Sequence, residues 1–151
     1  MSRAGGLALA CAAVLVAGCG STSRPPAKTL SHGRFVYLAD RVCARAHRQG
    51  AALGKPTNLN TFIRGLRKAI PLLESEIADL RALTPPSRDA APFQCMLANL
   101  DKEDVVGHDF LDSLEAHQMQ RARSLARRID RLDKRLRAQT RKLGLPTCAK
   151  A

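Results

Sequence analysis

The feature that most constrains the fold is a helical spacing of apolar residues that runs from Phe35 to Leu143. Apolar side chains recur there every three or four positions, which places them along one face of an α-helix. No stretch has the alternation of apolar and polar residues that a half-buried strand requires. Alanine, leucine and arginine, which favour helices, dominate the composition, and aromatic residues make up 3% of the chain. The sequence therefore predicts an all-α domain.

Proline and glycine divide the first half of this pattern into two helices. Ser31 can cap a first helix, which Gly54-Lys55-Pro56 would end. Asn58 can cap a second helix, and Thr84-Pro85-Pro86 would stop it. Pro71 lies inside the second helix, where we expect a kink without a break because the apolar period continues in phase.

The second half of the pattern predicts two more helices. Asp89 is expected to cap the third, with Pro92 in its first turn, and Gly144 is expected to end the fourth. A single helix over this stretch would be about 80 Å long. A turn is therefore expected around Ala116–Met119. Short connections between four amphipathic helices predict an antiparallel up-down-up-down four-helix bundle over residues 30–151.

Residues 1–18 have the pattern of an export signal. Arg3 precedes the apolar run Leu7–Val16, which is about half as long as a membrane span. The next residues, Val16-Ala17-Gly18-Cys19, resemble the lipobox of bacterial lipoproteins. The resemblance implies cleavage between Gly18 and Cys19 and a diacylglycerol thioether on Cys19. Residues 19–29 would then be the lipidated cysteine and a flexible tether, and the protein would lie on the extracytoplasmic side of the cell membrane.

The strong positive charge of the chain limits the kinds of molecule that we expect it to bind. The chain has 25 lysine and arginine residues against 13 acidic residues, a net charge of +12 at pH 7. Export and the scarcity of aromatic residues for base stacking argue against nucleic acid. Anionic lipid headgroups or acidic wall polymers are the expected neighbours, and a basic surface that only keeps the domain soluble is the alternative.

The cations are concentrated in the last predicted helix. It carries Arg121, Arg123, Arg127, Arg128, Arg131, Lys134, Arg135, Arg137, Arg141 and Lys142. The residues that we expect to contact an anionic surface are Arg121, Arg127, Arg128, Arg131 and Arg135.

Three cysteines besides Cys19 fall within the predicted bundle. Cys43 lies in the first helix, Cys95 lies early in the third, and Cys148 follows the fourth. An antiparallel bundle would bring all three toward one end, where thiols outside the cytoplasm tend to pair. One of the three must remain single, and the spacing alone leaves the pairing open.

A set of short motifs resembles a group of small predicted lipoproteins from high-GC Gram-positive bacteria. The motifs are the lipobox, Val42-Cys43-Ala44, Leu80-Arg81-Ala82-Leu83-Thr84-Pro85-Pro86 and Leu143-Gly144-Leu145-Pro146-Thr147-Cys148. The resemblance covers most of the chain after residue 18. It implies a helical architecture without an assigned reaction, and it favours a disulfide between Cys43 and Cys148. Cys95 would then be a buried free thiol.

Two groupings of residues have the spacing of metal ligands. Cys43 and His47 share a helix face and Cys95 could add a ligand, but the expected disulfide would use Cys43. In the third helix, His108 lies among acidic residues; we call this group the acidic stripe (Asp101, Asp104, His108, Asp112 and Glu115). The stripe could bind a cation or act in acid–base chemistry. We expect it instead to meet the basic side of the fourth helix, and we expect neither a metal nor a cofactor.

The sequence predicts a binding protein and not an enzyme. It contains no nucleophile elbow, no glycine-rich phosphate loop and no HExxH motif. The leading hypothesis is a lipid-anchored, non-catalytic helical domain that binds or senses a component of the cell envelope. One alternative is a structural or assembly protein that self-associates through the fourth helix. Another is a small-molecule-binding bundle with a gap near Pro71 and Gly107.

Overall fold

The computed structural model describes residues 29–150, and this part of the chain is all-helical, as predicted. The helices are α1 (His32–Ala51), α2 (Leu59–Arg81), α3 (Ser87–Glu115), α4 (Met119–Leu143) and the short 3-10 helix η1 (Cys148–Lys150). Residues 29–150 contain no strand. The predicted export signal, Cys19 and nearly all of the predicted tether lie outside the described residues.

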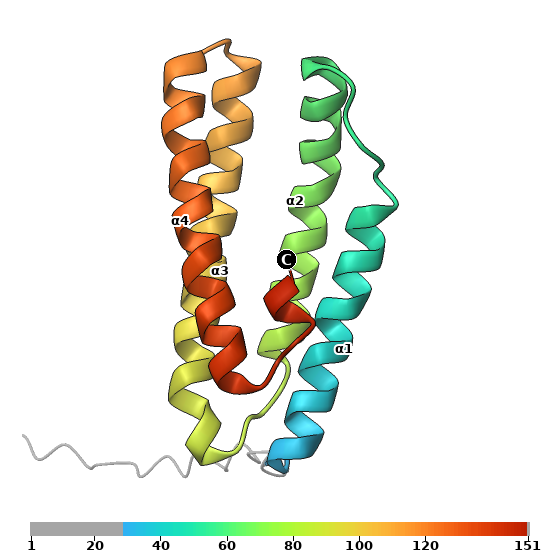
Figure 1. The fold of residues 1–151 in the computed structure, drawn as a ribbon, viewed down its shortest axis with the longest axis vertical. Coiled ribbons are helices and arrows are strands. Elements are labelled where there is room, and N and C mark those ends of the chain that lie inside the picture. Colours follow the sequence, from blue (N-terminus) through green and yellow to red (C-terminus); the bar gives the residue numbers. More distant parts are fainter. Residues whose placement is uncertain (1–28, 151) are drawn as a thin grey trace, which may run out of the picture.

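The four long helices form a bundle whose connections alternate between its two ends. The α1–α2 and α3–α4 connections lie at one end, and the α2–α3 connection lies at the other (Figure 1). The chain leaves α4 near the end where α1 begins, turns back, and finishes between α4 and α1. None of the helices within residues 29–150 combines the length and the apolar character needed to cross a membrane.

The first two helices begin at the predicted caps. The Ser31 hydroxyl accepts a hydrogen bond from the Arg34 backbone N–H at 3.4 Å. At α2, the Asn58 side chain accepts from the Thr61 N–H at 2.9 Å, and the Thr61 hydroxyl accepts from the Asn58 N–H at 3.0 Å. This reciprocal capping box satisfies two backbone donors that a helix start leaves without partners. Pro71 lies inside α2, and the helix continues through it.

The start of α3 differs from the prediction. The cap position is Pro86, and the helix begins at Ser87, so Asp89 lies in the first turn and Pro92 lies beyond it. Asp89 is nearly buried and its carboxylate lies 2.6 Å from Nδ1 of His32, at the start of α1. An acidic side chain in the first turn is favourable because it faces the positive end of the helix dipole. The carboxylate therefore joins the starts of two helices.

The last two helices end with the same backbone motif. After α4, Gly144 has a left-handed φ of 74°, and the Leu145 N–H bonds back to the Thr140 carbonyl at 2.9 Å. After α3, His117 takes the same left-handed region with a φ of 57°, and the Gln118 N–H bonds back to the Ser113 carbonyl at 2.8 Å. Both are Schellman motifs. The predicted turn around Ala116–Met119 is confirmed, with a histidine where glycine is usual.

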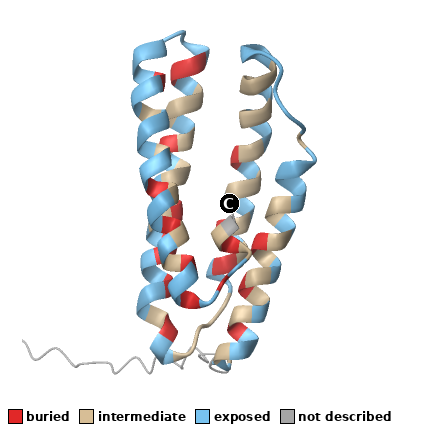
Figure 2. Ribbon diagram, in the orientation of Figure 1, coloured by how far each residue is buried: buried red, intermediate tan, exposed pale blue. Residues whose placement is uncertain are grey.

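The core is built from the apolar sides of the helices and from the chain after α4. Figure 2 shows the buried positions on the sides of the helices that face one another. Phe35 of α1 and Phe93 of α3 meet edge to face with their ring centroids 4.9 Å apart, and both are fully buried. Leu145, which follows the glycine that ends α4, is also fully buried.

A disulfide fixes this closing segment onto α1. Cys43 and Cys148 are bonded with their Cα atoms 5.1 Å apart, so the predicted pairing is confirmed. Beside it, Asp40 of α1 accepts hydrogen bonds from the backbone N–H of Thr147 at 2.8 Å and from its hydroxyl at 2.6 Å. Cys95 is a free thiol, but the expectation that it is buried was wrong, because it lies exposed on α3.

Candidate functional site

The predicted cationic residues of α4 lie together on its outer side. At 100° per residue, the helix places its exposed cations within an arc of about 160° that contains no acidic residue. We call this arc the basic face; it comprises Arg121, Arg123, Arg127, Arg128, Arg131, Lys134, Arg135, Arg141 and Lys142, all exposed. The five arginines expected to contact an anionic surface are all members of it.

Few of these cations have acidic partners. Arg121 lies 3.5 Å from Asp109 of α3, and Lys134 lies 2.8 Å from Asp130 at the margin of the face. Within residues 29–150, no carboxylate lies within ion-pair distance of the remaining members: Arg123, Arg127, Arg128, Arg131, Arg135, Arg141 and Lys142. The structure therefore leaves most of the charge of the basic face free to act on an external partner.

The opposite side of α4 is occupied by the protein's own core. Ala122, Leu132, Leu136 and Leu143 are each at most 7% exposed. Thr140 is buried with them, and its hydroxyl donates to the Leu136 carbonyl at 3.0 Å. These residues therefore pack within the chain, whereas Leu125 and Ile129 are half-buried and Met119, at the start of α4, is exposed.

The acidic stripe meets α2, and the expectation that it meets α4 was wrong. Asp101 pairs with Arg81, and Glu115 pairs with Arg67 at 2.7 Å, both arginines coming from α2. The ion pair between α3 and α4, from Arg121, goes to Asp109, which is not part of the stripe. The physical reason is that α2 carries its own cations at the register of the stripe, while the basic face of α4 points outward.

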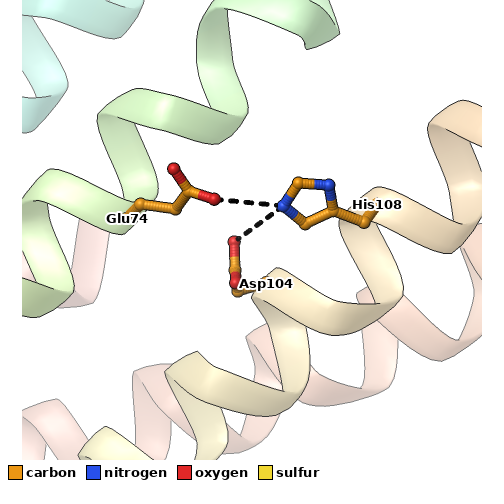
Figure 3. A group of neighbouring side chains, drawn as sticks. All are labelled: Glu74, Asp104 and His108. Atoms are coloured by element: carbon orange, nitrogen blue, oxygen red, sulfur yellow. Dashed lines mark hydrogen bonds and ion pairs between the residues drawn. The ribbon is translucent and has the colours of Figure 1, made fainter.

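Two carboxylates lie close to the His108 ring where α2 and α3 meet. Glu74 Oε1 of α2 lies 3.1 Å from His108 Nε2, and Asp104 Oδ1, one turn before His108 on α3, lies 3.8 Å from the same nitrogen (Figure 3). We call these three residues the carboxylate–histidine cluster. Two of them belong to the predicted stripe. Glu74 was not predicted because it comes from another helix, and spacing along one helix carries no signal of it.

Two further carboxyl groups face the interior. Glu76 of α2 and Glu103 of α3 border a central cavity of about 70 Å³, which is otherwise mainly apolar and reaches the disulfide. Burial raises the pKa of Glu76 to about 7; Glu103 adds to the rise and Arg45 opposes it. Burial likewise raises the pKa of Glu103 to about 7, with Asp133 adding to the rise and Arg137 opposing it. Neither residue was predicted from the sequence.

Neither Pro71 nor Gly107, where the sequence predicted a gap, borders the central cavity. The central cavity has room for about two waters, at roughly 30 Å³ each. A β-carbon added at Gly107 would lie in ordinary contact, 4.0 Å from Ile70. A larger hollow of about 520 Å³ lies open at the surface beside the α1–α2 connection, where Lys55, Arg64 and Lys68 border it.

The grouping of Cys43, His47 and Cys95 does not form a metal site. The disulfide to Cys148 takes the Cys43 sulfur, and Cys95 is exposed on α3. Comparisons with known proteins add no assignment, since no family model, curated protein or solved structure matches the chain.

Proposed function

We propose that this protein is a lipid-anchored, non-catalytic helical domain on the extracytoplasmic side of the cell membrane, and that its basic face binds the anionic lipid headgroups of that membrane. The observation that carries the proposal is the long arc of exposed cations on α4, most of which have no acidic partner among the described residues. Near an anionic bilayer, each lysine or arginine contributes about 1 kcal/mol of attraction. Several unpaired cations on one helix are therefore sufficient for a stable contact.

The reach of the predicted tether is similar to the length of the basic face. The chain from Cys19 to Ser31 spans at most about 40 Å when extended. The 25 residues of α4 measure about 37 Å at 1.5 Å per residue. In an antiparallel up-down-up-down order, α4 ends beside the start of α1, where the predicted tether would join. The whole length of the basic face is then within reach of the membrane that holds the lipid.

The two alternative functions have less support. Self-association through α4 would need a continuous row of apolar residues free to meet another chain, and Ala122, Leu132, Leu136 and Leu143 of α4 are buried in the bundle. A small-molecule site would be expected to enclose roughly 300–1,000 Å³. The central cavity is much smaller, and the hollow beside the α1–α2 connection is open to solvent.

The test is binding of the unlipidated chain, residues 20–151, to vesicles with and without anionic lipid. We expect binding only to anionic vesicles, with added salt weakening it through screening. A variant with Arg127, Arg128, Arg131 and Arg135 changed to glutamine should bind about tenfold or more weakly, since each cation contributes about 1 kcal/mol.

A matched control removes the same charge elsewhere. Arg48, Lys55, Arg64 and Lys68 are exposed cations of α1, α2 and their connection. Their replacement by glutamine should leave most of the binding in place. Equal losses in both variants would show that net charge alone attracts the chain and would contradict a role for the basic face. Equal binding to neutral vesicles, or none to either kind, would overturn the proposed membrane contact.

A further inference from the structure

The carboxylate–histidine cluster brings three potential metal-ligand atoms together from two helices. Asp104 and His108 are four residues apart and therefore share one side of α3. Glu74 reaches them from α2, and Figure 3 shows both carboxylates pointing toward the His108 ring. The three ligand atoms, two carboxylate oxygens and Nε2, all lie within 4.8 Å of one another.

The cluster is negatively charged and incompletely paired. Neither Glu74 nor Asp104 forms an ion pair with a lysine or arginine among residues 29–150, although the chain carries a net charge of +12. Both contacts converge on one nitrogen, which can donate only one hydrogen. Asp104 Oδ1 is consequently buried without a hydrogen-bond partner. A buried carboxylate oxygen in this state is unfavourable unless a cation compensates it.

The spacing matches the coordination shell of a small metal ion. A four-coordinate ion with ligands at about 2.0–2.2 Å separates those ligands by about 3.3–3.6 Å. The observed separations from Nε2 are 3.1 Å to Glu74 and 3.8 Å to Asp104. Glu74 and His108 are each 51% exposed in their side chains, so small rotations can adjust the remaining distance and solvent can fill an open position.

The ligand types select the class of ion. Mg²⁺ and Ca²⁺ prefer all-oxygen shells, and Cu⁺ prefers thiolate or thioether sulfur. One imidazole nitrogen with two carboxylate oxygens suits Zn²⁺ and neighbouring divalent transition metals. We propose that Glu74, Asp104 and His108 form a binding site for a divalent transition-metal ion such as Zn²⁺, which links α2 to α3. The proposal does not depend on the membrane contact of α4.

Titration of the full-length chain in detergent with Zn²⁺ at neutral pH, after removal of bound metal with a chelator, tests the site. We expect one Zn²⁺ per chain and a rise in melting temperature on binding, since an ion that binds only the folded state stabilises it. Glu74→Ala, Asp104→Ala and His108→Ala should each weaken binding by about tenfold or more, because each removes one of three protein ligands.

Two control variants separate this site from scattered surface binding. Asp112 is as far from His108 in sequence as Asp104 is, on the other side, but it is not part of the cluster. Asp112→Ala and His117→Asn should therefore leave Zn²⁺ binding unchanged. The proposal is overturned if Zn²⁺ does not bind, if Glu74→Ala binds as the original chain does, or if millimolar Mg²⁺ displaces the Zn²⁺.

Discussion

Glu76 and Glu103 are carboxyl groups whose protonation is coupled to folding. Burial raises the pKa of each to about 7, so the folded chain holds their protons more tightly than the unfolded chain does. Folding stability from these groups is fully present below the ordinary pKa of 4.5. It is lost as the pH rises through about 7, where the carboxyls must ionise beside the apolar cavity. Among the described residues, the Glu103 Oε2 atom has no hydrogen-bond partner that would stabilise its charge.

The variant Glu103→Gln tests this coupling. It should match the original chain in stability at pH 4 and exceed it at pH 8, because the amide cannot ionise. The Glu76 and Glu103 side chains keep some contact with water. We therefore expect the substitution to raise the free energy of unfolding at pH 8 by about 1 kcal/mol, well below the value that the full pKa shift would give. Urea unfolding across this pH range, with a chelator present throughout, measures it. Asp112→Asn, at an exposed acid of the same helix, should leave the pH dependence as it was; an unchanged slope in Glu103→Gln would contradict the prediction.

At the level of single residues, the sequence predicted local chemistry better than partners across helices. Ser31, Asn58 and Gly144 act as predicted because a cap depends on a few neighbouring residues. His117 was not predicted to hold a left-handed turn, since glycine usually takes that position. Asp89 is of a residue type that often caps helices, but the partner of its carboxylate is His32, which is remote in sequence. Spacing along the chain contains no information about such a contact.

At the level of helices, periodicity predicted which side faces inward but not which helices meet at the outer edges. Ala122, Leu132, Leu136 and Leu143 of α4 are buried as expected, and Leu125 and Ile129 are partly buried. The acidic stripe, however, lies against α2, where Arg67 and Arg81 supply the opposite charges. Exposed pairs of this kind are each worth less than about 1 kcal/mol, so charge pattern is a weak guide to helix neighbours. Glu74 was not predicted because spacing along α3 does not indicate which residues of α2 lie beside it.

The disulfide that joins the segment after α4 to α1 should make a measurable contribution to the free energy of unfolding. Cys43 and Cys148 are 105 residues apart, and closing a loop of that size is worth about 4–5 kcal/mol in the chain-entropy model. Cys43→Ser and Cys148→Ser should each lower the free energy of unfolding by a similar amount. The double variant should add little, because both changes remove the same bond. Cys95→Ser, at an exposed thiol, should change stability by less than about 0.5 kcal/mol.

Denaturant unfolding of these variants, together with non-reducing peptide mapping of protein extracted from membranes, measures both parts of this prediction. Additive losses in the double variant would mean that the two cysteines act separately. A peptide joining Cys95 to Cys148 would contradict the disulfide pairing itself.

At the level of the whole molecule, the amino-terminal prediction has a direct test. Cys19→Ser should leave an unprocessed, unlipidated precursor, because a serine hydroxyl cannot form the thioether. Metabolic labelling with a fatty acid and the mass of the mature chain both measure this outcome. Val42→Ala, at a partly buried position of α1, serves as a control and should be processed normally. Equal fatty-acid labelling of Cys19→Ser and the original chain would contradict the lipoprotein prediction.

The disulfide between Cys43 and Cys148 also decides how the molecule would carry mechanical force. If lipid held the amino terminus and a pull acted on the basic face, tension would pass along α1 to Cys43, cross the covalent bond, and enter α4 from its carboxyl end. Helices α2 and α3 lie on the other arm of the covalent ring, outside this short path. The load would then fall on α1 as far as Cys43 and on α4 from its carboxyl end to the point of the pull, and α2 and α3 would remain intact while the chain was stretched.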